Sequence, residues 1–144
     1  MTQFRKLTAA IALPVFLAAC AGAGIKDQGQ IRQSVETATP DTVFVFRDTG
    51  FQGSATLMTV ALNDVEVGKV GVNESLEFTA PAGTHVVTVK AGGLDGSLVK
   101  PGVAQIVKDG SKAHYFIVGI KQKFFGAEVT LVETTPASYL AAAQ

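Results

Sequence analysis

The sequence predicts an all-β fold, a small antiparallel β-sandwich of seven to eight short strands. From Thr42 onward, β-branched and aromatic residues recur with a period of two in short runs. Gly, Asn, Asp and Pro separate these runs, as expected of turns. With 144 residues, 47% of them hydrophobic, the chain is long enough for one domain with a buried core. The same pattern is compatible with a barrel, so the sequence leaves sandwich and barrel open.

Residues 1–19 predict a secretory signal peptide. Arg5 and Lys6 precede an apolar run from Leu7 to Ala19, which contains Pro14. The run is shorter than the roughly 20 residues that a helix needs to cross a hydrocarbon core. We therefore expect a cleaved signal rather than a transmembrane span.

The end of this run, LAAC at residues 17–20, resembles the lipobox of bacterial lipoproteins. The resemblance implies that Cys20, the chain's single cysteine, is acylated, for example with palmitate, and becomes the first mature residue. Ala21 stands where an aspartate would favour the inner membrane, so the resemblance implies the outer membrane with the domain facing the periplasm. The alternative is a secreted protein without lipid, whose cysteine lies at the cleavage point by chance.

The lipidated cysteine and the residues after it, 20–40, predict a flexible tether. They are rich in Ala, Gly, Gln, Ser and Thr and poor in large apolar residues. A short helix over Gln30–Ala38 is compatible with the sequence, but no strong apolar stripe fixes it.

The β domain is expected over residues 41–135. Asn63-Asp64 and Asp109-Gly110 predict tight turns that tolerate positive φ, and Gly83 predicts a turn after Pro81. The expected strands are Thr42–Arg47, Ala55–Leu62, Val65–Val70, Ser75–Thr79, Thr84–Lys90, Ala104–Lys108, Ala113–Ile120 and Ala127–Glu133.

The C-terminal residues 136–144 predict a short helix. Thr135 is suited to cap it, and Pro136 suits its first position. Such a short helix is stable only if Tyr139 and Leu140 dock on the sheet.

Residues 41–135 resemble the DUF2846 family of bacterial lipoproteins. The segments that carry the resemblance are VFVFRDTGFQGS, VALNDVEVGKV, APAGTHVVTVK, VKDGSKAHYFIVGI and FFGAEVTLVE, in that order. The segment PAGTH at 81–85 is also similar to the PEGA repeat of envelope proteins. The chain departs from the family in its Asn63-Asp64 hairpin and in His114-Tyr115, where the family tends to have two tyrosines. The resemblance implies a compact β-sandwich on a lipid anchor and supplies no catalytic residues.

Charge and motifs argue against several classes of function. Twelve basic residues balance twelve acidic ones, and no basic block suggests nucleic-acid binding. The only histidines, His85 and His114, lack metal-ligand spacing, and no serine lies in a nucleophile elbow. We therefore expect a non-enzymatic protein without cofactor or metal. An enzyme that uses His85 is the third hypothesis.

The strongest candidate for contact with a partner is the segment from Lys121 to Gly126. It combines Lys121 and Lys123 with Phe124 and Phe125 at a strand end. Aromatic rings provide contact area, and lysines attract anionic surfaces. The alternative is that at least one phenylalanine folds back into the core and the lysines are only solvated.

The main hypothesis is an envelope lipoprotein that acts as a binding or accessory module for an unidentified ligand, with the membrane and an envelope protein as partners. A second hypothesis is a periplasmic inhibitor of an envelope hydrolase. Its reactive element would be the loop Ala91–Gly102, which is rich in glycine and long for a hairpin connection.

Overall fold

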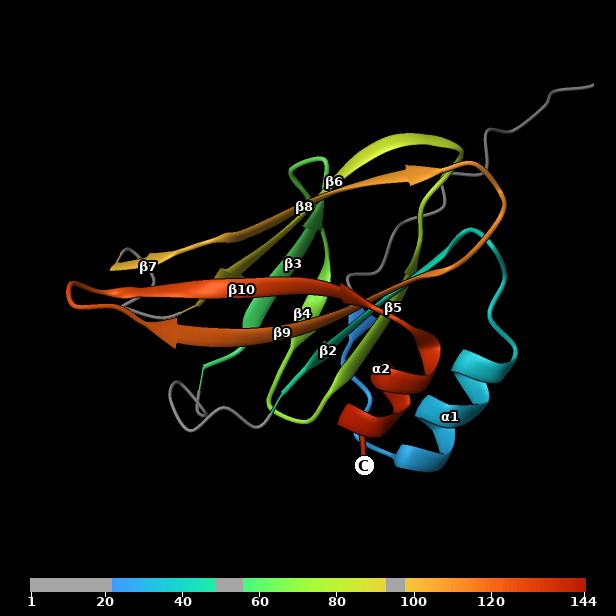
Figure 1. Ribbon diagram of the computed structural model, residues 1–144, viewed down its shortest axis with the longest axis horizontal. Coiled ribbons are helices and arrows are strands. Elements are labelled where there is room, and N and C mark those ends of the chain that lie inside the picture. The colour runs from blue at the N-terminus through green and yellow to red at the C-terminus, as the bar shows by residue number, and fades with distance from the viewer. Residues whose placement is uncertain (1–21, 49–55, 93–97) are drawn as a thin grey trace, which may run out of the picture.

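In the computed structural model, which describes residues 22–48, 56–92 and 98–144, two β-sheets pack face to face and two short helices lie beside one of them (Figure 1). Each sheet has five strands. The predicted β-sandwich is therefore confirmed, but the described residues form ten strands where seven to eight were expected. The expected signal peptide and Cys20 lie outside the described residues, as do residues 49–55 and 93–97.

The first sheet has the order β1-β4-β3-β6-β8. Its hairpin between β3 and β4 turns at Asn63 and Asp64, whose φ values are 49° and 66°, so the predicted tight turn is confirmed. Gly83, which follows the predicted turn after Pro81 and is the first residue of β6, also has a positive φ of 126°. The strands are β1 (Gly22–Ala23), β3 (Met58–Leu62), β4 (Val65–Val70), β6 (Gly83–Ala91) and β8 (Gly102–Lys108).

The second sheet has the order β5-β2-β9-β10-β7. Its two longest strands, β9 and β10, form one antiparallel hairpin in register from Tyr115 opposite Thr134 to Gln122 opposite Ala127. The strands are β2 (Thr42–Arg47), β5 (Ser75–Thr79), β7 (Val99–Lys100), β9 (His114–Gln122) and β10 (Ala127–Thr134).

The expectation of purely antiparallel pairing is wrong for three strand pairs. β1 pairs with β4, β2 with β9, and β7 with β10, all in parallel. Between β2 and β9 the chain visits both sheets, so no hairpin sets their relative direction, and a parallel pair requires such a long connection. The strands β1 and β7, of two residues each, are also too short to show a period of two in the sequence.

The main core lies between the sheets. On β6, His85, Val87 and Val89 point inward, as predicted, and the two valines are completely buried. Alternation along each strand produces this layer, because successive side chains of a strand lie on opposite faces. Its fully buried members include Val43, Val45, Met58, Val60, Val70, Val87, Val89 and Val118.

A second, smaller core covers the outer face of the second sheet. The helices α1 (Gln28–Glu36) and α2 (Pro136–Ala142) pack over Phe44, Phe46 and Tyr115. The predicted C-terminal helix is confirmed, because the Thr135 side chain caps α2 by accepting a hydrogen bond from the backbone N–H of Ser138 at 3.2 Å. Tyr139 of α2 is fully buried against this aromatic face.

The prediction of a flexible tether over residues 20–40 is wrong for the part that the structure describes. Ile25 exchanges two backbone hydrogen bonds of 2.8 Å with Ser75, and β1 adds to the edge of the first sheet. Ile31 and Val35, one helical turn apart on α1, are buried against the second core. These two apolar side chains are sufficient to hold α1 on the sheet, because they cover an aromatic face that would otherwise be exposed to water.

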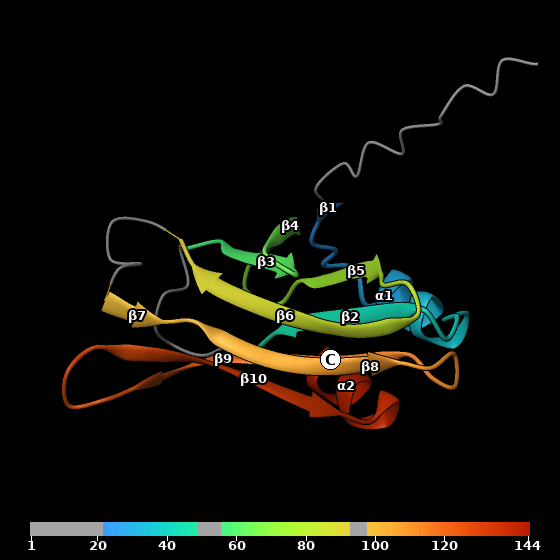
Figure 2. The ribbon, with the colours of Figure 1, turned by 90° about the horizontal axis from the view of Figure 1, so that it is seen from above.

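Both helices lie at one end of the molecule, and the β9–β10 hairpin extends beyond the sheets at the other end (Figure 2). None of the helices in the described ranges is long and apolar enough to cross a membrane.

Candidate functional site

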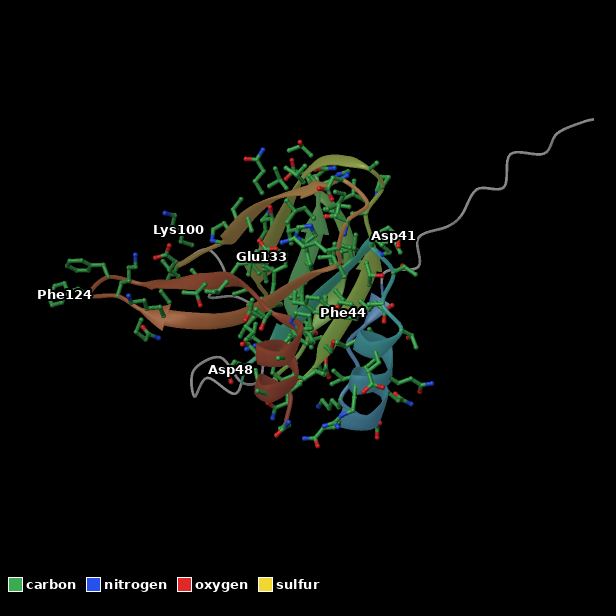
Figure 3. All side chains as sticks on the ribbon, turned by 45° about the vertical axis from the view of Figure 1, so that its right-hand side comes forward. Asp41, Phe44, Asp48, Lys100, Phe124 and Glu133 are labelled. Carbon is green, nitrogen blue, oxygen red and sulfur yellow. The ribbon has the colours of Figure 1, made fainter. Side chains whose placement is uncertain are left out.

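The hairpin tip, defined as residues 121–128 with Leu98 and Lys100, holds the most exposed aromatic side chains among the described residues. Phe124 is 95% exposed and Phe125 is 87% exposed. Their rings meet edge to face with centroids 4.7 Å apart. Figure 3 shows Phe124 at the far end of the hairpin, well away from Phe44 and the helices. Among the described residues, the tip therefore presents two rings to solvent without a covering element.

The turn of the hairpin fixes these rings at its end. The backbone N–H of Lys123 donates a hydrogen bond to the carbonyl oxygen of Gly126 at 3.1 Å. Gly126 has a φ of 78°, and a Cβ atom there would lie 2.7 Å from the carbonyl oxygen of Leu98. Glycine is thus required both by the backbone conformation and by the close approach of Leu98.

Leu98 and Lys100 join the tip through the parallel pairing of β7 with β10. Val99 lies opposite Ala127, and Lys100 lies opposite Glu128. Leu98, directly before this pair, is 71% exposed. Side chains from two distant parts of the sequence therefore form one apolar and cationic surface.

The charge of the tip is positive. Lys123 forms an ion pair with Glu128. The hydrogen bond and charge of Lys123, with the nearby charges of Lys100 and Lys121, hold the pKa of the Glu128 carboxyl below its usual value. Three lysines thus surround one carboxylate, and the excess positive charge lies directly behind the two exposed rings.

All four residues predicted as a contact site, Lys121, Lys123, Phe124 and Phe125, lie in this tip. The alternative, that a phenylalanine folds back into the core, is wrong, because both rings are exposed. Sequence reasoning included Leu98 and Lys100 only in the loop Ala91–Gly102, did not assign them to the tip, and missed Glu128. A large apolar residue in a glycine-rich loop was the available signal for Leu98, while Lys100 and Glu128 join only through strand pairing.

The loop Ala91–Gly102, predicted as a reactive element, lies partly outside the described residues. Its described ends contribute Ala91 to β6 and Val99–Lys100 to β7. The loop therefore returns to the sandwich at the base of the hairpin tip.

His85 has a structural environment. Its Nε2 donates to the carbonyl oxygen of Pro81 at 2.7 Å, which leaves Nδ1 to accept a hydrogen bond from the Asn63 amide at 2.8 Å. Asn63 in turn accepts a hydrogen bond from the backbone N–H of Val86. His85 thus links the β3–β4 turn at Asn63 to the β5–β6 connection at Pro81.

His114 lies on the second sheet, and its Nδ1 is 2.7 Å from the Glu133 carboxylate. The structure therefore gives the two histidines different partners on different sheets. In the described part of the chain, no group of three or more His, Cys, Asp and Glu side chains is placed to hold a metal ion.

Lys108 is a buried lysine that sequence reasoning missed. Its Nζ donates to the carbonyl oxygens of Pro40, Thr42 and Lys112. Burial lowers its pKa, and nearby carboxylates, first Asp41, act in the opposite direction. Three carbonyl partners make this lysine a tie between the start of β2 and the β8–β9 turn.

Comparison with known proteins shows a likeness to a solved structure. No family model matches the chain, and no curated protein matches it. The sandwich is similar to an NMR structure of a protein from Eubacterium rectale, with 17% sequence identity and a TM-score of 0.38, over 62% of this chain and 85% of that one.

Proposed function

We propose that the protein is a non-enzymatic lipoprotein of the bacterial cell envelope, held at the outer membrane by an acylated Cys20 and facing the periplasm. Its β-sandwich would serve as a binding or accessory module that makes contact through the hairpin tip. The exposed pair Phe124–Phe125 in front of three lysines is the observation that carries this proposal.

The anchor is supported by the LAAC segment at residues 17–20. Acyl chains contribute about 0.8 kcal/mol for each buried CH₂ group, so two or three chains hold a protein stably at a membrane surface. The first described strand, β1, includes Gly22, two residues after the cysteine. Two residues of chain span at most about 7 Å, so an acylated Cys20 would hold the edge of the first sheet directly against the membrane.

The tip lies far from this anchoring edge, as Figure 2 shows for β1 and the end of the β9–β10 hairpin. β1 is one edge strand of the first sheet, and β8, whose Gly102 lies against Val129 of β10, is the other. Four strand spacings of about 4.8 Å separate these edges by roughly 19 Å, and the tip lies beyond β8 along the hairpin. The module could therefore be anchored at one place and make contact at another.

The tip suits binding rather than chemistry. Its polar side chains are Lys100, Lys121, Gln122, Lys123 and Glu128, and this set contains no Ser, Cys or His to act as a nucleophile beside a base. Burying one exposed phenylalanine is worth about 1.5–3 kcal/mol. Two rings and their lysines could thus support a specific contact without any catalytic group.

The anchor is tested by intact mass and membrane fractionation of the wild-type chain beside Cys20→Ala. We expect the wild type to gain acyl mass and to float with the outer membrane, and the variant to do neither. A mature wild-type protein that carries no lipid and stays in the soluble fraction would show that the anchor is wrong.

The contact is tested with a photoreactive amino acid in place of Phe124 in intact cells. Val132, exposed on β10 away from the tip, is the matched control position. We expect crosslinked product from position 124 and little from position 132. Equal labelling from the two positions, or none from either, would remove the tip from the proposal.

A further inference from the structure

The shape of the hairpin tip restricts what it can bind. It is the end of the β9–β10 hairpin, which reaches beyond the other strands (Figure 1), and β7 lies beside it at Ala127 and Glu128, so the tip is narrow. A stable protein interface buries about 800 Å² on each partner, whereas one aromatic side chain supplies about 150–250 Å². Phe124, Phe125 and Leu98 together fall short of such an interface. A lipid surface requires no preformed pocket, because apolar side chains enter the headgroup and acyl boundary about 5–10 Å deep.

The order of side chains along the hairpin matches the layers of a membrane surface. The two rings lie at its end. Behind them, Lys100 and Lys121 lie opposite Glu128 on the two neighbouring strands, and Lys123 forms an ion pair with Glu128, so that the three lysines form one lysine set. Lysine stems reach several ångströms while their ammonium groups stay at the level of the lipid headgroups. Rings that enter the acyl boundary would thus bring three ammonium groups to the phosphates, against one carboxylate that Lys123 already neutralises.

We infer that the hairpin tip is a lipid-contact site, in which Phe124 and Phe125 enter the acyl boundary of an anionic phospholipid surface and the lysine set faces its phosphates. The inference rests on the proposed function, because it names the partner that the tip of the module contacts. Charge complementarity selects anionic over neutral lipid. The contact is separate from the anchor at Cys20 and needs no acylation of its own.

The test uses the absence of tryptophan from the chain, which makes Phe124→Trp a unique fluorescent reporter. The full-length protein is mixed with vesicles of phosphatidylethanolamine and phosphatidylglycerol that carry brominated acyl chains, which quench tryptophan on contact. Phe125→Trp is the second reporter. Val132→Trp, exposed on the same strand pair but remote from the tip, is the matched control.

We expect a blue shift and strong quenching for both tip reporters and neither for Val132→Trp. Phosphatidylcholine vesicles, or about 1 M salt, where the screening length is near 3 Å, should abolish most of the quenching. Replacing Lys121 or Lys100 by Gln should weaken vesicle binding by about fivefold for each lysine removed. The brominated lipid is placed either in the vesicles that hold the anchored protein or in a second vesicle population. Quenching in the first case indicates that the tip contacts the same membrane, and quenching in the second case indicates contact with a facing membrane.

A tip reporter that keeps the emission of a water-exposed tryptophan, although the protein floats with anionic vesicles, would overturn the inference and favour an acidic protein partner. Equal quenching of Val132→Trp would overturn it as well, because contact would then be general. The same measurement on Cys20→Ala, beside the intact mass of the wild type, separates the two proposals. Quenching of the tip reporter in Cys20→Ala retains the lipid contact, and a wild type without acyl mass then removes the anchor alone. An acylated wild type whose tip reporter is not quenched retains the anchor and removes the lipid contact.

Discussion

The two ends of strand β9 carry aromatic residues in opposite environments. At its start, Tyr115 stacks on Phe44 with ring centroids 5.0 Å apart, and both lie beneath the helices. Beyond its other end, the rings of Phe124 and Phe125 meet each other and are otherwise exposed in the part of the chain that the structure describes. Figure 3 shows Phe44 and Phe124 in these two places. The covered pair, Phe44 and Tyr115, stabilises the fold because the helices bury it. The exposed pair, Phe124 and Phe125, contributes little to the core and is available for contact with a partner.

The largest expected effect is that of Phe44→Ala, which tests the covered region. Phe44 is completely buried and contacts the rings of Tyr115 and Tyr139. The free energy of unfolding should fall by about 3–5 kcal/mol, because the substitution opens a large cavity. Urea unfolding measures it. A loss below about 1 kcal/mol would mean that the helical layer does not hold the second core.

Ile31→Ala tests whether α1 belongs to this layer. Ile31 is 2% exposed, so we expect a loss of about 2–4 kcal/mol of unfolding free energy. The matched control is Arg32→Ala, at an exposed position of the same helix, which should change stability by less than about 0.5 kcal/mol. A flexible tether would make the two variants indistinguishable by chemical denaturation.

Alkaline pH should destabilise the covered region through its buried phenol. Burial raises the pKa of Tyr139, and its hydrogen bond to Ser75 at 2.5 Å partly opposes this. Above about pH 10 the unfolded chain releases this proton first, so stability should fall by up to about 1.4 kcal/mol for each pH unit. Below pH 10 both states keep the proton and the contribution is constant.

Tyr139→Phe is the control for this pH dependence, since lysine titration is common to both chains. Denaturation curves at pH 8 to 12 should show a shallower loss of stability in the variant. Parallel curves over that range would contradict the assignment of the effect to Tyr139.

Gly126→Ala tests how the tip is held. Gly110 has nearly the same φ as Gly126, 79° against 78°, but a Cβ there would meet no atom within 4 Å. Gly110→Ala should therefore cost on the order of 1 kcal/mol from backbone strain alone. Gly126→Ala should cost about 1 kcal/mol more, since it also clashes with Leu98. Equal melting temperatures of the two variants would show that the backbone at Leu98 moves away from the added Cβ atom at no cost.

The smallest effect on stability is expected from Phe124→Ala combined with Phe125→Ala. Both side chains are exposed, so the free energy of unfolding should change by less than about 0.5 kcal/mol. Binding to anionic vesicles, measured by flotation at low salt, should nevertheless drop sharply. A large loss of stability would show that the tip supports the fold and is not a free contact surface.

Local patterns predicted much of this fold. Three strands have the bounds that were predicted from the sequence pattern: β2 and β4, with six residues each, and β5, with five. Helix α2 was predicted from Thr135 and Pro136, and it lies there. These features are predictable because they depend on neighbouring residues, through strand period, turn φ and helix caps.

The sequence by itself determined the eight longer strands, their turns and the position of two phenylalanines in the turn between β9 and β10. Tertiary structure alone decided that Ile31 and Val35 cover an aromatic face, that β2 runs parallel to β9, and that Leu98 and Lys100 join the hairpin tip. The physical reason is the separation along the sequence over which each effect acts. Backbone preference and period act over a few residues, whereas burial and strand pairing depend on surfaces that meet only after the chain has folded.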